Sequence, residues 1–216
     1  DIAQTLIDKR LEATYSFTLL GSVEGVEAVS VNVKGVVAVI ESIIKNQMQI
    51  GAGGDAYVVV HRDEVLSFPS EICYKMTKED SNIGRRNSTL REAEIHERFF
   101  NEVNEYTDLC VGVPEPFYSL KLGTHELIAM ELLGAASVKD ILNGTGRVPD
   151  WLDVDVFCDH LQETLTRLHN THMFHRDLHE GNIMIRQTKE APDDGKWGYI
   201  IDFGYSAYDL YDAEPY

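Results

Sequence analysis

A polar loop near the C-terminal end of the chain carries the side chains best suited to chemistry. The stretch MFHRDLHEGNIMI places His175, Arg176, Asp177 and Asn182 between apolar residues, and the later stretch YIIDFGYS supplies Asp202. A carboxylate can take a proton from a hydroxyl group within hydrogen-bonding reach, and carboxylate and amide oxygens are ligands that Mg²⁺ prefers. These residue types therefore suit base catalysis beside a hard cation.

Regular structure on both sides must hold this loop in place. A helical stripe precedes it, formed by Val156, Phe157, Leu161, Leu165 and Leu168. This stripe predicts a helix that ends near Asn170 and leads the chain into the loop. NIMIRQ and WGYIIDF then predict the two strands of a hairpin, which would hold the polar loop at one end and the letters DFG at the other.

Strands and one further helix are predicted upstream. MQIGAGGDAYVVVHR and EVLSFPSEICYKM are apolar or alternating runs broken by Gly, Asp and Pro, a pattern typical of an antiparallel sheet. A second helical stripe is formed by Leu90, Ala93, Ile95, Phe99 and Val103. Ser88 or Thr89 can cap this helix. VPEPFYSLKLGTHELIAMELL returns to strand-like character, and SVKDIL predicts a short helix that NGTG ends.

Residues 1–45 form a region of their own. Their apolar residues recur at spacings near three and four, from Leu6 and Ile7 through to Ile43 and Ile44. This spacing predicts a helical N-terminal extension. The many β-branched residues leave a strand as the alternative.

Composition narrows the partners and the compartment. The 216 residues include 36 acidic and 19 basic side chains, a formal charge of −17, which disfavours nucleic acid and anionic membranes as partners. This charge serves either solubility alone or a preference for basic partners. Three widely spaced cysteines and the lack of a long apolar run predict neither a disulfide framework nor a membrane span, and they favour a cytoplasmic protein.

The order of the polar letters resembles a known family. HRD, with Asn182 five positions after Asp177, and the later DFG resemble the catalytic loop and the metal-binding loop of the protein kinase superfamily. The resemblance implies that Asp177 is the catalytic base, that His175 orients the loop, and that Arg176 is a site for an activation-loop phosphate. It also implies that Asn182 and Asp202 bind Mg²⁺ beside ATP.

The same resemblance assigns the upstream sheet to nucleotide binding. IGAGGDAYV occupies the place of the loop that covers the phosphates, and its contributing residues are Gly51, Ala52, Gly53, Gly54 and Val58. The usual third glycine of such loops is Ala56 here. Lys75 would contact the α- and β-phosphates and pair with a helix glutamate, for which Glu92 is preferred over Glu94.

The stretch LIAMELL looks like the connector between the two lobes of a kinase. It places Met130 at the gatekeeper position. The residues from Glu131 to Leu133 would offer backbone groups to the adenine ring of ATP, a form of recognition that requires no particular side chain.

Four histidines allow a different metal hypothesis. His169, His172, His175 and His179 are spaced three or four apart, as imidazoles that share a helix face often are. A helix that ends near Asn170 would not line them up, so the kinase interpretation is preferred. His179 also stands where protein kinases often carry lysine, which leaves the class of substrate open.

The implied architecture is an α+β, bilobal, protein-kinase-like fold. It comprises the helical extension at 1–45, an antiparallel-sheet N-lobe at 46–131 and a mainly helical, shortened C-lobe at 132–216. Twelve residues follow Gly204, which predicts either a piece of a longer kinase or a naturally short one. In outline the chain is similar to effector kinases that bacterial pathogens inject into the host cytosol and to the minimal kinase of the KEOPS complex. Such kinases often require an activating or scaffold partner, for which 1–45 is the candidate docking element.

Three functions remain open on the sequence alone. The first is an ATP- and Mg²⁺-dependent protein kinase that acts on Ser or Thr hydroxyls of a protein substrate, which Arg176 favours. The second is a kinase of a small hydroxyl compound, of the aminoglycoside or choline type, which the stretch HRDLHEGN and the lack of a peptide-binding region suggest. The third is a nucleotide-binding interaction module that transfers no phosphate.

Overall fold

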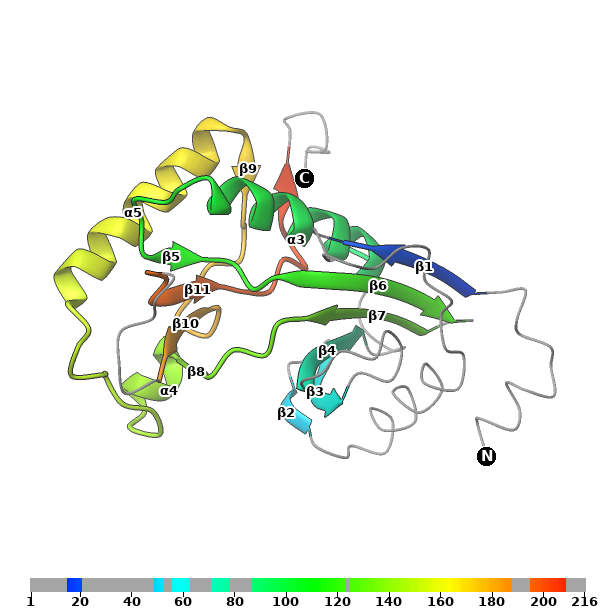
Figure 1. Ribbon diagram of the computed structural model, residues 1–216, viewed down its shortest axis with the longest axis horizontal. Helices are drawn as coiled ribbons and strands as arrows, with labels where there is room; N and C mark the ends of the chain where they lie inside the picture. The colour runs from blue at the N-terminus through cyan, green and yellow to red at the C-terminus, as the bar shows by residue number, and fades with distance from the viewer. Residues whose placement is uncertain are drawn as a thin grey trace. The chain divides into compact units, whose positions relative to one another are not determined.

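The computed structural model describes residues 15–20, 49–52, 56–62, 71–77, 87–122, 125–187 and 195–208 (Figure 1). The chain divides into two compact units, Asp1–Ala93 with Pro116–Leu132 and Glu94–Glu115 with Leu133–Tyr216. The division at Leu132 lies next to the end of the predicted N-lobe. Residues 94–115, however, group with the second unit, because Ile95, Phe99 and Val103 pack into its core.

The first unit contains a six-stranded antiparallel sheet in the order β1-β6-β7-β4-β3-β2. Its strands are β1 (Tyr15–Leu19), β2 (Gln49–Ala52), β3 (Ala56–Arg62), β4 (Glu71–Thr77), β6 (Pro116–Leu122) and β7 (His125–Met130). Aromatic and β-branched residues are frequent in these segments, which suits a pleated surface with one buried face. The predicted antiparallel sheet is confirmed.

Strand β1 corrects the prediction for the N-terminal extension. A helix was predicted over 1–45, but Tyr15–Leu19 is a strand that pairs with β6. The sequence YSFTL is rich in aromatic and β-branched residues, and the edge of β6 offers backbone hydrogen-bond partners that a helix would leave unused. Leu20 follows β1, is buried, and packs with Ala93 and Ile128. The other residues of 1–45 lie outside the described part of the chain.

Helix α3 (Thr89–Asn104) begins at the predicted position. The Oγ atom of Ser88 accepts a hydrogen bond from the backbone N–H of Arg91 at 3.2 Å, which is the bond an N-cap side chain makes. Thr89 is instead the first residue of the helix. Of the two predicted caps, Ser88 is therefore the one that the structure uses.

The second unit adds two helices and two small sheets to the C-terminal part of α3. The helices are α4 (Val138–Leu142) and α5 (Val154–Asn170). One sheet has the order β5-β11-β10-β8, from Val111–Gly112, Gly198–Ile200, Ile183–Arg186 and Ala135–Ser137. The other pairs β9 (Met173–Phe174) with β12 (Ala207–Tyr208).

Helix α5 ends at Asn170 as predicted, but its predicted stripe is wrong at one position. Val156 is 36% exposed, whereas Phe157 and Leu168 are buried in the core of the unit. Phe157 reaches β11 because Gly198 has no side chain: a Cβ there would lie 2.3 Å from Phe157 Cε2. The predicted helical spacing was thus correct, but the buried face of the helix begins at Phe157 and not at Val156.

The predicted hairpin of β10 and β11 is confirmed, with Ile183 opposite Ile200. The expectation that the polar loop and DFG lie at different ends of it is wrong. Asn182 precedes the first strand and Ile201 follows the second, and antiparallel pairing brings those two positions to the same end. The hairpin therefore joins the two polar motifs instead of separating them.

Candidate active site

The first unit holds a buried ion pair between Lys75 and Glu92. Lys75 lies in β4, opposite Val58 of β3 and Ile128 of β7, and Glu92 lies in the first turn of α3. The Lys75 Nζ and Glu92 Oε1 atoms are 2.5 Å apart, and the two residues are only 5% and 2% exposed. Glu94 is exposed. Burial makes each charge of the pair depend on its partner, since an unpaired buried charge is costly.

The predicted phosphate-covering loop is described only in part. Gly51 and Ala52 belong to β2 and pair with Val58 and Tyr57, whereas Gly53 and Gly54 lie outside the described residues. Directly paired residues of an antiparallel ladder share one face, so Val58 and Lys75 project from the same face of the sheet.

The predicted connector follows β7. Met130 is the last residue of that strand and packs against the cluster of Leu20, Ala93 and Ile128. Glu131 and Leu133 are half-buried and have no regular structure. Their proposed contacts with adenine remain predictions.

Backbone and side-chain hydrogen bonds close the polar loop of the second unit on itself. The side-chain amide of Asn182 donates to the Asp177 carbonyl oxygen at 2.9 Å, and the Asn182 backbone N–H donates to the His179 carbonyl oxygen at 2.9 Å. The Asp177 N–H lies 3.4 Å from His175 Nδ1. Asn182, itself buried, therefore fixes the main chain at Asp177.

The same loop is bonded to the segment that carries Asp202. The Ile201 N–H donates to the Asn182 carbonyl oxygen at 3.1 Å, and His175 Nε2 bonds the Ile201 carbonyl oxygen at 2.9 Å. The Ser206 hydroxyl donates to the His175 carbonyl oxygen at 2.9 Å. His175 thus holds the chain on both sides of Asp202, and one unit brings Asp177, Asn182 and Asp202 together.

His175 is suited to this role as a neutral ring. Burial lowers its pKa below the ordinary histidine value, against the opposing effects of the Ile201 hydrogen bond and of the carboxylates of Asp202 and Asp177. With the Asp177 N–H directed at Nδ1, the proton of the neutral ring lies on Nε2 and is donated to Ile201. Ser206 was not predicted to hold His175. The sequence shows only a hydroxyl residue two positions after DFG, and its burial is known from the structure.

Two residues of the site adopt left-handed backbone conformations. The φ angles are +63° at Arg176 and +64° at Asp202, neither of which is glycine. Such conformations are unfavourable for ordinary side chains and persist where surrounding contacts impose them, which is often at functional sites. Gly204 N–H lies 3.3 Å from Asp202 Oδ1 and helps to hold that carboxylate.

The phenylalanine of DFG anchors the segment in the core. Phe203 is 1% exposed, and its ring centroid lies 4.8 Å from those of His96 and Phe99 in α3 and 5.4 Å from that of His175. His96 is itself fixed, because its Nε2 lies 2.7 Å from the Pro114 carbonyl oxygen. Asp202 is therefore followed by a tightly packed residue.

The donor set fits Mg²⁺. The amide nitrogen of Asn182 is engaged by Asp177, so the oxygen is the atom of that side chain left for a cation, and Asp202 supplies a carboxylate. Mg²⁺ commonly takes one or two protein oxygens and completes its shell with water and phosphate oxygens. Over the described ranges, no group of three or more His, Cys, Asp or Glu side chains could hold a metal.

The four histidines do not converge. His169 stacks on Phe174 with ring centroids 5.3 Å apart, and His175 bonds Ile201. His179 accepts a hydrogen bond from Gly181, and His172 lines a separate cavity. Each ring thus has different surroundings.

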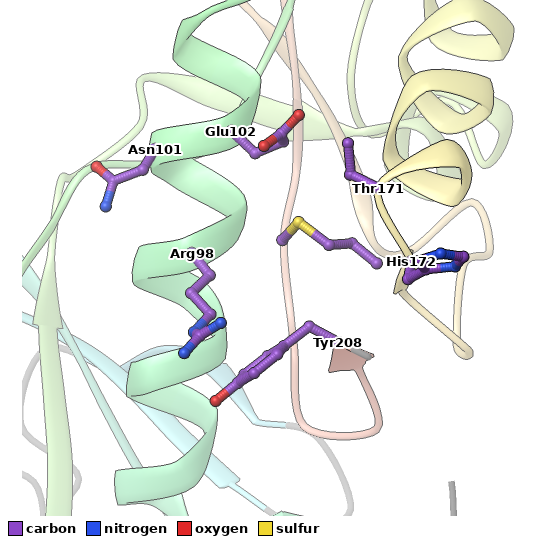
Figure 2. Close-up of a pocket in the computed structure, with 7 residues that line it drawn as sticks. Arg98, Asn101, Glu102, Thr171, His172 and Tyr208 are labelled. Carbon is purple, nitrogen blue, oxygen red and sulfur yellow. The ribbon is translucent and has the colours of Figure 1, made fainter. Parts of the chain in front are cut away.

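That cavity lies apart from the polar loop. It has a volume of about 490 Å³ and is lined by Arg98, Asn101, Glu102, Thr171, His172, Met173 and Tyr208 (Figure 2). The Arg98 guanidinium lies 3.6 Å from the centre of the Tyr208 ring. The cavity contains none of the residues predicted for catalysis.

No helix in the described part of the chain is long and apolar enough to cross a membrane.

The chain is similar in sequence to known proteins. Residues 44–211, more than half of the chain, match the family model for the protein kinase domain. Casein kinase I homolog 1 of Schizosaccharomyces pombe is 25% identical over 95 residues, which are 44% of this chain and 21% of that protein. Casein kinase I homolog 3 of Saccharomyces cerevisiae is 25% identical over 87 residues, 40% of this chain and 16% of that protein. The chain thus spans about a fifth or less of the relatives' length in these matches. With its HRD and DFG segments hydrogen-bonded to each other, the chain belongs to the protein kinase domain family.

Proposed function

We propose that the chain transfers the γ-phosphoryl group of ATP to a Ser or Thr hydroxyl of a protein substrate in the presence of Mg²⁺. The observation that carries the proposal is the hydrogen-bonded linkage of Asp177, Asn182 and Ile201. Because Asp202 follows Ile201, this linkage gathers the proposed base, Asp177, and two oxygen ligands, Asn182 and Asp202, in one unit. The protein kinase match and the names of the two yeast relatives support the reaction class.

In the proposed reaction Asp177 orients the acceptor hydroxyl and takes its proton. The acceptor oxygen bonds to the γ-phosphorus as the bond from that phosphorus to the β–γ bridging oxygen breaks, which leaves ADP. Asn182 and Asp202 would hold Mg²⁺, which neutralises charge on the phosphates when bound. Because little covalent chemistry falls to the protein, fixed positions of these side chains are its main contribution.

The first unit would bind the rest of the nucleotide. Lys75, held by Glu92, would contact the α- and β-phosphates, and the backbone of Gly51 to Gly54 would cover them. Val58 would contact the adenine ring, and Met130 to Leu133 would border it. Arg176, exposed beside Asp177, is proposed to receive a phosphate from a regulatory segment or partner.

Removing the base tests this function. Asp177→Asn should reduce γ-phosphoryl transfer at least about 1,000-fold. Its affinity for ATP with Mg²⁺ should stay within about threefold, because the base contributes to transfer and not to nucleotide binding. Transfer is measured with radiolabelled ATP on casein and on a basic protein, and affinity by calorimetry.

The acceptor decides between the remaining candidates. A panel of small alcohols, including choline and an aminoglycoside, is assayed in parallel with the proteins. Transfer to a small alcohol alone would replace the protein-kinase proposal. Equal transfer by wild type and Asp177→Asn would remove Asp177 as the base, and tight ATP binding with no transfer to any acceptor would favour an interaction module.

A further inference from the structure

Strand β1 and the residue after it lie outside the part of the chain that matches the kinase family. The family model covers residues 44–211, whereas β1 is Tyr15–Leu19 and Leu20 follows it. All of β1 pairs with β6, and the Leu20 backbone N–H donates to the Phe117 carbonyl oxygen at 2.9 Å. The Leu20 side chain is buried. The proposed reaction gives this segment no part.

Leu20 packs beside the buried ion pair of the first unit. It forms one cluster with Ile128 of β7 and Ala93 of α3, and each of the three is no more than 1% exposed. Ile128 lies directly opposite Lys75 in the sheet. Ala93 directly follows Glu92 in the helix. The start of α3 and the sheet therefore meet at two adjacent contacts, the ion pair and the apolar cluster that contains Leu20.

Close packing in this cluster holds the start of α3. Ala93 has only a methyl group, so the larger side chain of Leu20 supplies much of the apolar contact with that helix position. The Leu90 backbone N–H lies 3.5 Å from Glu126 Oε2, which is longer than the usual range of about 2.7–3.2 Å. Backbone pairing of β1 with β6 gives Leu20 a fixed position on the sheet. Removing its side chain would leave a cavity into which the helix can shift.

We propose that Leu20 is a positioning residue for phosphoryl transfer, which holds the start of α3 so that Glu92 keeps Lys75 in place for the phosphates. The inference rests on the proposed function, since that function assigns Lys75 to the nucleotide. Leu20 acts through α3 and takes no part in the chemistry itself. A displacement of about 1 Å in a group that positions substrate can cost about 100-fold in rate, so a cavity at Leu20 is sufficient to slow transfer.

Two variants of the full chain separate this role from general stability. Leu20→Ala removes the contact with α3. The matched control is Leu120→Ala, because Leu120 is also 1% exposed and lies in β6, the strand that pairs with β1. Its neighbour Ser119 lies opposite Ile128, which in turn lies opposite Lys75. Since successive side chains of a strand alternate between faces, Leu120 projects from the face opposite to that of Lys75.

We expect both variants to lower the midpoint of urea denaturation, because each leaves a cavity in the core. Only Leu20→Ala should lower kcat, by about tenfold, when all proteins are assayed at temperatures where they are fully folded. Leu20→Met, which nearly conserves the side-chain volume, should retain wild-type kcat. Equal kcat values for Leu20→Ala and Leu120→Ala would overturn the positioning role.

A double-mutant cycle tests the route through the ion pair. Glu92→Gln removes the charge that holds Lys75, so the position of α3 should then matter little to the lysine. Adding Leu20→Ala to Glu92→Gln should therefore change kcat by less than about twofold. A further loss of about tenfold in the double variant would show that Leu20 does not act through Glu92, and would overturn the proposal.

Hydrogen exchange gives a readout that needs no turnover. The backbone N–H of Glu92 donates to the Ser88 carbonyl oxygen at 2.8 Å and begins the hydrogen bonding of α3. Exchange of the amides of residues 92–95 should be at least about tenfold faster in Leu20→Ala than in wild type, and should not change in Leu120→Ala. If wild type transfers no phosphate, the proposed function fails. Unchanged exchange of these amides in Leu20→Ala would overturn the positioning role separately.

Discussion

At the scale of single residues, the site depends on buried polar groups that are ion-paired or hydrogen-bonded. Lys75 and Glu92 satisfy each other's charge, and His175 and Asn182 hold the backbone at both polar motifs. Removing one member of a buried polar pair is costly in free energy, because the other member then loses the interaction that offset its burial. Function and stability are therefore coupled at these positions.

Lys75→Met should show this coupling. We expect it to lower the free energy of unfolding by about 3–5 kcal/mol, because it removes the cation beside the buried Glu92 carboxylate. Urea denaturation measures the change, and phosphoryl transfer should fall in the same variant because Lys75 would no longer hold the phosphates.

A second substitution separates the two effects. Lys75→Met combined with Glu92→Leu should recover most of the stability and none of the activity, since two apolar side chains leave no buried charge. The control is Lys121→Met in the same sheet, whose partner Glu126 is 2.9 Å away and whose own side chain is 46% exposed. It should cost less than about 1 kcal/mol. A Lys75→Met variant as stable as Lys121→Met would show that the buried pair is not structural.

At the scale of elements, close packing of α5 on β11 positions the hairpin that ends in DFG. Phe157 fills the space beside Gly198, which lies in β11. β11 pairs with β5 along one edge and with β10 along the other. The hairpin sets Asn182 and Ile201 at one end, so a shift of β11 would be felt at both polar motifs. The packing of Gly198, which lies in the strand that leads into DFG, thus affects the geometry of both motifs.

Gly198→Ala should destabilise the second unit. The added methyl group would lie 2.3 Å from Phe157 Cε2 and 3.3 Å from the Met184 carbonyl oxygen, so the ring must move. We expect a loss of about 1–3 kcal/mol in the free energy of unfolding, measured by urea denaturation.

The control for this prediction is Gly134→Ala, where nothing lies within 4 Å of the added carbon. It should be nearly neutral. Adding Phe157→Leu to Gly198→Ala should reverse part of the loss, because the smaller side chain leaves room for the methyl group. A Gly198→Ala variant as stable as Gly134→Ala would contradict the packing argument.

Periodicity predicted the helices and strands near the site better than it predicted their mutual placement. The end of α5 and the β10–β11 hairpin follow from local patterns, whereas the meeting of Asn182 with Ile201 depends on antiparallel pairing. The strand at Tyr15–Leu19 was missed because its partner β6 lies about a hundred residues away, and tertiary pairing there overrides helical spacing. The role of Ser206 depends on a contact with His175 that no residue spacing encodes.

At the scale of the whole molecule, charge is the property most open to test. The formal charge of −17 raises the local concentration of basic partners and repels acidic ones. If this field guides the substrate, the KM for a basic Ser/Thr peptide should rise severalfold between 50 and 300 mM salt as the field is screened, roughly as the Debye length shortens. A peptide of the same length and no net charge is the control and should show little change. Equal salt dependence for both peptides would leave the charge with a solubility role alone.

The anchoring of Phe203 bears on inhibition. A compound that occupies the space of this ring must first expel it from contacts with His96, Phe99 and His175. Hydrogen bonds from His175 to Ile201 and from Ser206 to His175 hold the chain on either side of the ring. The free energy of that rearrangement is subtracted from the compound's own affinity. Molecules that leave the ring in place should therefore be the stronger leads for blocking the proposed phosphoryl transfer.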